Sequence, residues 1–198
     1  WDTYRTTHPL FTWFYPDDAA AFSTTLTRMA DEHGYLPRWP LAVNETGTML
    51  GAPATIILAD TLLRGVDDFD VDRAWQAMLD DARFVDGKTI RGNTHRCHEL
   101  GWCPADEVGR GVANAVEYAW ADFALAYALQ NLPQDGQHDG EEAFASELVT
   151  RSQVWQGHFD DDTGFLRGRT ADGDLRDVGE DRGERHGEPA HEPVVRLG

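Results

Sequence analysis

Residues 112–132, VANAVEYAWADFALAYALQNL, show the clearest periodicity in the chain. Large apolar side chains recur there every three or four residues, which places them along one side of a helix. These side chains are Val112, Val116, Trp120, Phe123 and Tyr127. The stretch therefore predicts one long amphipathic helix that ends near Leu132.

Four other segments are expected to be helical, at residues 17–33, 49–64, 70–87 and 140–159. At the start of the first, Asp17 and Asp18 favour the positive end of the helix dipole, and Gly34 follows as a stop. Asp70 is suited to cap the third helix, because its carboxylate can accept a hydrogen bond from a free N–H group of the first turn.

This pattern of helices and loops predicts an all-α protein. No segment shows a convincing alternation of a strand, and two long loops, residues 35–48 and 87–111, are rich in Gly, Pro and aromatic residues. Loops of this length inside a compact domain usually carry function. Paired helices with long loops at one end indicate part of an α-helical toroid, about five helices of it, in which the inner helices line a cavity.

The end of the chain differs in composition from the rest. Residues 168–198 include 13 charged side chains and no aromatic one. We therefore expect a helical domain over residues 1–167, followed by an irregular or disordered tail over 168–198. A frameshift that replaced the native continuation is the alternative interpretation of this tail.

Charge limits the partners of the protein. The 198 residues carry 35 acidic and 17 basic side chains, for a formal net charge of −18 at pH 7. Nucleic acid and anionic membrane surfaces both need a basic footprint, so neither is expected as a partner. No apolar run is long enough to span a bilayer. The acidity fits a secreted or salt-adapted protein, although the sequence leaves the localisation undecided.

The first residues, WDTYR, have the composition of a sugar site. Aromatic rings stack on the apolar faces of a pyranose, and Asp2 and Arg5 can hold its hydroxyl groups through charge-assisted hydrogen bonds. A loop held together by an Asp–Arg pair is an equally good interpretation. Glu45, which precedes an expected helix, is a possible ligand of a sugar or of calcium or a catalytic carboxylate, but capping that helix is the favoured interpretation.

Two further groups of polar residues remain. His95, Cys97, His98 and Cys103 match a zinc site by residue type but not by spacing, so a packed loop with at most one disulfide is the default. Glu117 and Asp122 lie five positions apart on the long helix and point in different directions, so they do not form a catalytic pair. One of them is a candidate to face a cavity, and otherwise each pairs with an arginine or faces water.

Several strings occur in one order along residues 1–167: WDTYRT at 1–6, LPRW at 36–39, NETGTM at 44–49, GWCP at 101–104 and EYA at 117–119. Together they resemble glycoside hydrolase family 92, the calcium-dependent α-mannosidases. The resemblance implies an N-terminal β-sandwich, an (α/α)6 toroid and removal of terminal α-mannosyl residues, often α-1,2-linked, from glycans with inversion. Trp1 and Asp2 match the family motif of the mannose subsite, and Arg5 and Glu45 are carried over as substrate contacts.

The resemblance also implies that parts of the family pattern lie outside this chain. The strings that carry the general acid and the general base do not occur in it, so the catalytic residues, the β-sandwich, the rest of the toroid and most calcium ligands are expected elsewhere. We therefore expect the isolated chain to be inactive, and we assign no metal ligand in it. The alternatives are another (α/α)6 hydrolase, trehalase-like or glucoamylase-like, and a non-catalytic glycan-binding remnant.

Overall fold

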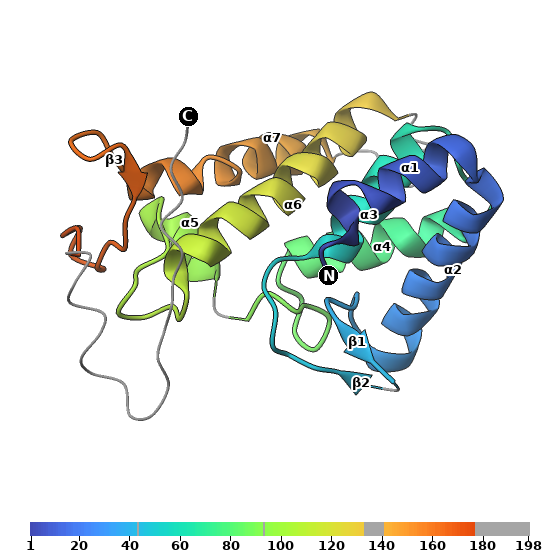
Figure 1. Ribbon diagram of the computed structural model, residues 1–198, viewed down its shortest axis with the longest axis horizontal. Helices are drawn as coiled ribbons and strands as arrows, with labels where there is room; N and C mark the ends of the chain where they lie inside the picture. Colours follow the sequence, from blue (N-terminus) through green and yellow to red (C-terminus); the bar gives the residue numbers. More distant parts are fainter. Residues whose placement is uncertain (43, 93, 133–140, 177–198) are drawn as a thin grey trace.

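The structure is a computed structural model that describes residues 1–42, 44–92, 94–132 and 141–176 (Figure 1). The described α-helices are α1 (Thr7–Phe14), α2 (Pro16–His33), α3 (Pro53–Leu63), α4 (Val71–Ala82), α5 (His95–Leu100), α6 (Gly111–Asn131) and α7 (Glu142–Arg151). Two 3₁₀ helices, η1 (Thr3–Arg5) and η2 (Val154–His158), accompany them. The prediction of an all-α chain that forms part of an (α/α)6 toroid is confirmed.

Helix α6 organises the molecule. It packs most extensively against α7 on one side and α3 on another, and α3 in turn contacts α1 and α2 (Figure 1). Its predicted range, 112–132, agrees with the observed helix to within one residue at each end. None of the described helices is long and apolar enough to cross a membrane.

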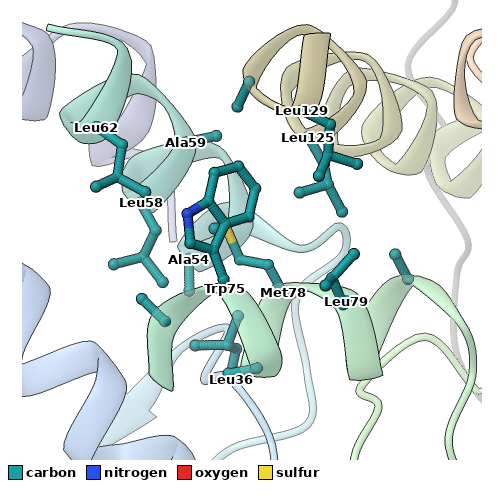
Figure 2. Packing of buried hydrophobic residues seen from close by; sticks show 14 of the residues in the cluster. Leu36, Ala54, Leu58, Ala59, Leu62, Trp75, Met78, Leu79, Leu125 and Leu129 are labelled. Carbon is teal, nitrogen blue, oxygen red and sulfur yellow. The ribbon is translucent and has the colours of Figure 1, made fainter. Parts of the chain in front are cut away.

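The main core lies where α3, α4 and α6 meet. Trp75 and Met78 of α4 pack with Leu58 of α3 and Leu125 of α6 (Figure 2). Leu36, from the loop after α2, closes the same cluster and is only 2% exposed. Burial of each such side chain contributes roughly 1.5–3 kcal/mol, so this cluster fixes the relative positions of the three helices.

Of the first three predicted helices, the first has the expected boundaries to within one residue, and the other two do not. Helix α2 matches the predicted 17–33, and Gly34 ends it in the left-handed conformation at φ +88°. The predicted start at 49 is wrong, because Gly51 has a φ of +81° and Pro53 occupies the first turn of α3. The predicted end at 87 is also wrong: α4 is capped by Asp70 as expected but stops at Ala82.

The fifth predicted helix, 140–159, is shorter than expected. Helix α7 ends at Arg151, and the chain continues into η2, while the predicted start at Gly140 lies outside the described residues. Helices α1 and α5 were not predicted. Helix α1 directly follows the string WDTYRT, and α5 lies inside the expected long loop 87–111.

The expectation of no strands needs a small correction. Strands β1 (Pro40–Leu41) and β2 (Asn44–Glu45) pair antiparallel, with Pro40 opposite Glu45. Strands β3 (Phe159–Asp160) and β4 (Phe165–Leu166) form a second antiparallel hairpin. Each strand has only two residues, too few for an alternating pattern to be visible in the sequence.

The first part of the expected tail packs against the loop after α5. The backbone N–H of Ala105 donates to the carbonyl of Arg169 at 2.8 Å, and the indole N–H of Trp102 donates to the carbonyl of Thr170 at 2.9 Å. Residues 177–198 of that tail lie outside the described residues.

Candidate functional site

The first motif folds onto the middle of α6. The indole Nε1 of Trp1 donates to the carbonyl oxygen of Leu50 at 3.1 Å. Tyr4 is buried, and its hydroxyl donates to Oε2 of Glu117 at 2.7 Å, while Nη2 of Arg5 donates to Oε1 of the same carboxylate at 2.6 Å. Residues more than a hundred positions apart therefore share one site.

A pocket of about 710 Å³ opens at this place. Three tryptophans line it, Trp1, Trp120 and Trp155, and most of its other walls are apolar side chains of α6. Arg5 and Glu117 also line it. Aromatic walls beside a charged pair are what a pyranose needs, because its C–H faces stack on rings and its hydroxyl groups require polar partners.

The charged pair is partly shielded from solvent, Glu117 more than Arg5. The side chain of Glu117 is 16% exposed and that of Arg5 37%. The Arg5 guanidinium also lies 4.4 Å from the centre of the Tyr4 ring, a cation–π distance. Burial raises the pKa of Tyr4, and the hydrogen bond to Glu117 and the charge of Glu117 raise it further, so the phenol remains a donor.

The other two expected substrate contacts lie elsewhere. Asp2 is exposed, precedes η1 and makes no side-chain capping bond. Glu45 lies in β2, and its carboxylate accepts hydrogen bonds from the backbone N–H groups of Arg38, Trp39 and Gly47 at 2.7, 2.9 and 3.0 Å. The interpretation of Glu45 as a helix cap is wrong, because α3 begins only at Pro53.

The hydrogen bonds to Glu45 also set its charge state. Burial acts to raise its pKa, but the N–H groups of Gly47, Arg38 and Trp39 and the charge of Arg38 outweigh burial, so the pKa is lowered. Glu45 is thus an ionised residue that holds its own loop together, and neither it nor Asp2 is among the residues that line the pocket.

Arg38 joins this loop to the turn before α3 and to α6. Only 8% exposed, it donates to the carbonyl oxygens of Met49, Gly51 and Ile90, each at 2.8 Å, and to the hydroxyl of Tyr118 at 2.5 Å. Sequence reasoning assigned it no role. The available signal was a lone arginine inside the apolar string LPRW.

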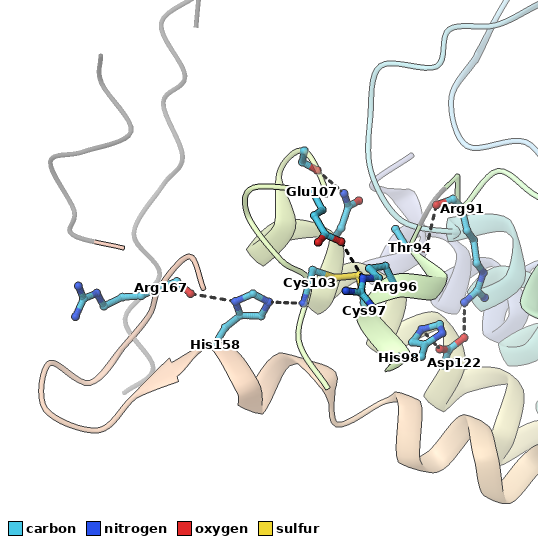
Figure 3. Close-up of a disulfide and its surroundings, with 12 residues drawn as sticks. Arg91, Thr94, Arg96, Cys97, His98, Cys103, Glu107, Asp122, His158 and Arg167 are labelled. Atoms are coloured by element: carbon cyan, nitrogen blue, oxygen red, sulfur yellow. Dashed lines mark hydrogen bonds and ion pairs between the residues drawn. A yellow bond between two sulfur atoms is a disulfide. The ribbon is translucent and has the colours of Figure 1, made fainter. Parts of the chain in front are cut away.

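Asp122 lies in a buried ion-pair network and does not line the pocket. Arg91 bridges the carboxylates of Asp81 and Asp122, and Figure 3 shows its ion pair with Asp122. Arg151 Nε donates to Oδ2 of Asp122 at 3.2 Å. The side chains of Arg91 and Asp81 are fully buried, and that of Asp122 is 1% exposed. The network joins α4, α6 and α7, so Asp122 has a structural role.

The zinc hypothesis is wrong. Cys97 and Cys103 form a disulfide, and both residues are buried (Figure 3). Zinc binds the thiolate form of cysteine, so a disulfide removes both sulfur ligands from the set. The loop is held further by His158, whose Nε2 accepts from the backbone N–H of Cys103 at 3.0 Å.

Calcium requires several oxygen ligands at one place. Within the described ranges, no group of three or more His, Cys, Asp or Glu side chains is placed to hold a metal ion. Glu117, the carboxylate among the described residues that line the pocket, already accepts hydrogen bonds from Tyr4 and Arg5. The described residues therefore do not fit a calcium site.

His98 makes the stability of this region depend on pH. Burial, together with the charges of Arg151, Arg91 and His95, lowers its pKa to about 3. Asp122 Oδ2 lies 3.7 Å from Nε2, but its charge is already balanced by Arg91 and Arg151. The folded-state pKa lies below the unfolded value near 6.5, so the stabilisation is present above pH 6.5 and is lost as the pH falls.

Changing the pH from 7.0 to 5.0 is thus expected to remove about 2 kcal/mol through this one group. In His98→Gln, the loss of unfolding free energy on acidification should be smaller than in wild type by this amount. In His33→Gln, a change at an exposed histidine, the loss should equal that of wild type. Urea unfolding at pH 7.0 and 5.0 measures the difference. Equal acid sensitivity in wild type and His98→Gln would contradict the assignment, since His8 and His158, whose pKa values are also lowered, are present in both.

A helical toroid segment that carries an aromatic pocket with a charged pair is typical of glycoside hydrolases. A model of the glycosyl hydrolase family 92 catalytic domain matches residues 1–192, and the chain belongs to this family. Comparison with curated proteins finds no match. The family membership decides against a trehalase-like or glucoamylase-like enzyme.

Solved structures of family GH92 mannosidases from Bacteroides thetaiotaomicron are similar to this chain. The inverting mannosidase BT2199 is 26% identical, with a TM-score of 0.77 and 89% of this chain covered. The α-mannosidase BT3965 is 30% identical, with TM-scores of 0.77 in complex with mannoimidazole and 0.78 without it, and 90% coverage. This chain spans only 22–23% of the length of those proteins.

Proposed function

We propose that the chain forms part of the catalytic domain of an exo-α-mannosidase and supplies one wall of its mannose-binding pocket. The observation that carries this proposal is the meeting of Trp1, Arg5 and Glu117 in a single aromatic pocket. The family membership supports the reaction class, and the complex of the similar BT3965 with mannoimidazole supports a mannose-like ligand. Mannose-containing glycans are the proposed substrates.

We infer an inverting mechanism from the family. Inversion at an α-mannosidic bond needs a general acid and a general base whose carboxyl groups lie about 6.5–9.5 Å apart. Among the described residues that line the pocket, Glu117 is the only carboxylate, and both of its oxygens already accept hydrogen bonds. We therefore place the acid, the base and the calcium ligands outside this chain. We expect the residue that the enzyme removes to be a terminal α-1,2-linked mannose.

The exposed side of α6 supports a larger catalytic domain. Trp120, Phe123 and Tyr127 are 45, 51 and 48% exposed, which is unusual for neighbouring large aromatic residues on one helix. We propose that residues 1–167 are part of the toroid, that further helices and a β-sandwich complete the pocket, and that 168–198 is an irregular extension. The disulfide between Cys97 and Cys103 favours an oxidising, extracytoplasmic location.

Binding and turnover assays on the 198-residue chain test this function. We expect methyl α-mannoside to perturb the tryptophan indole signals in NMR, and we expect no release of 4-nitrophenol from its α-mannoside in calcium. Calcium-dependent turnover would contradict the placement of the acid and base outside the chain. A stronger response to the matched α-glucosides would contradict the mannose assignment, and absence of any binding would contradict the pocket itself.

A further inference from the structure

Glu117 occupies the point where three separate segments of the chain meet. Its two carboxylate oxygens bind Tyr4 and Arg5 of the first motif, and its own backbone belongs to α6. The third segment is the turn at Gly51, which lies directly against the Glu117 side chain. Two of these segments carry the strings WDTYRT and EYA, and the turn at Gly51 follows the string NETGTM of residues 44–49.

The turn at Gly51 is shaped to fit this carboxylate. A Cβ atom at position 51 would lie 3.0 Å from both Cβ and Oε2 of Glu117, and the φ of +81° disfavours any residue other than glycine. Arg38 holds the same turn in place by donating to the carbonyl oxygens of Met49 and Gly51. Glu117 is therefore enclosed by a turn that has little freedom to move.

The effect of Glu117 reaches the pocket through Arg5. The guanidinium that Glu117 holds lies 5.6 Å from the centre of the Trp1 ring and 6.0 Å from that of Trp120. Trp1 is held in turn by Leu50, the residue before Gly51. Loss of the carboxylate charge would release Arg5 and disturb both aromatic walls.

We propose that Glu117 is a positioning residue of the mannose-binding pocket, which orients Arg5 and Tyr4 and through them Trp1, and that Gly51 is required to admit it. This proposal rests on the proposed function, because it specifies how that pocket is shaped. Glu117 acts through Arg5, because each of its oxygens accepts a hydrogen bond from the first motif and Arg5 is the charged group held beside the rings of Trp1 and Trp120.

The first measurement needs no ligand. Glu117→Gln keeps the shape of the side chain and removes its charge, so the indole N–H signal of Trp1 should shift, while that of Trp75 in the α3–α4–α6 core should not. Glu107→Gln is the matched control, because it also breaks a 2.8 Å ion pair with an arginine, Arg96, away from the pocket. An unchanged Trp1 signal in Glu117→Gln would overturn the proposal.

The second measurement uses methyl α-mannoside as the probe. Glu117→Gln and Arg5→Met should each weaken binding about tenfold, and Glu107→Gln should leave it unchanged. The double variant should bind no more weakly than Arg5→Met alone, because Glu117 acts through Arg5. Additive losses would overturn this and place Glu117 in direct contact with the sugar.

Gly51→Ala gives an independent approach with the carboxylate intact. Its methyl group should displace Glu117 and shift the Trp1 signal in the same direction as Glu117→Gln, and a Trp1 signal like that of wild type would contradict the role of Gly51. If wild type binds no mannoside, the proposed function fails, whereas the ligand-free Trp1 signals still decide whether Glu117 positions Arg5.

Discussion

Replacing Arg91 by Met is expected to destabilise the chain by about 3–5 kcal/mol, because it leaves buried carboxylates without their partner. Arg91 contacts both Asp81 and Asp122, and its side chain is completely buried. Burial acts to lower its pKa, but the charges of Asp122 and Asp81 dominate and raise it, so Arg91 stays charged at any pH at which the protein folds.

The arrangement explains why the loss is large. Two carboxylates, Asp81 and Asp122, face two guanidinium groups, Arg91 and Arg151, inside the interior. Without Arg91, Asp122 retains Arg151, but the donors that Asp81 keeps among the described residues are neutral, the hydroxyl of Thr89 and the backbone N–H of Ile90. A buried carboxylate with neutral donors alone is costly, so Asp81 is the residue that makes the variant unstable.

Urea unfolding followed by circular dichroism measures this effect. Arg96→Met is the matched control, since Arg96 also pairs with two carboxylates, Glu99 and Glu107, but on an exposed surface. Its unfolding midpoint should stay close to that of wild type. If Arg91→Met and Arg96→Met shift the midpoint equally, the buried network does not carry the stability assigned to it.

Arg38→Met should lower the free energy of unfolding by about 3 kcal/mol and should also abolish mannoside binding. The variant loses four hydrogen bonds from one charged group, to Met49, Gly51, Ile90 and Tyr118. The carbonyl groups left behind include those of the turn against Glu117, so the pocket loses its support together with the loop.

Arg38→Lys tests the geometry of the guanidinium. An ammonium group is a compact donor and cannot reach four acceptors on different segments, so lysine should recover less than half of the lost stability. Arg110→Met is the control, because Arg110 is exposed and donates to a single carbonyl of the same loop, that of Thr48, at 2.7 Å. Full recovery by lysine, or an equal loss in Arg110→Met, would contradict this role of Arg38.

The sequence predicted helices accurately where their extent is set by side-chain periodicity and by a stop residue nearby. Helix α6 and helix α2 were predicted almost to the residue, because side-chain periodicity and the glycine stop at Gly34 act within a few residues. The boundaries failed at Gly51 and after Ala82, where the chain adopts conformations that depend on contacts with other segments. The family resemblance, carried by several strings in order, was also confirmed.

The candidate site could be predicted only in part. Trp1 and Arg5 were proposed as substrate contacts and both line the pocket, whereas Asp2 and Glu45 do not. Whether any of them binds substrate stays a prediction. The role of Arg38 was not predicted, because it depends on hydrogen bonds to four acceptors that lie between 11 and 80 positions away in sequence.

The sequence by itself determined helices α2 and α6, the acidic character and the family, since each depends on residue type and short-range spacing. Only the tertiary structure decided which charges meet. Glu117 and Asp122 lie five residues apart on one helix, yet one binds Arg5 beside the pocket and the other binds Arg91 in the interior. The physical reason is that five positions turn a helix by more than a full revolution, and only packing settles what each side then faces.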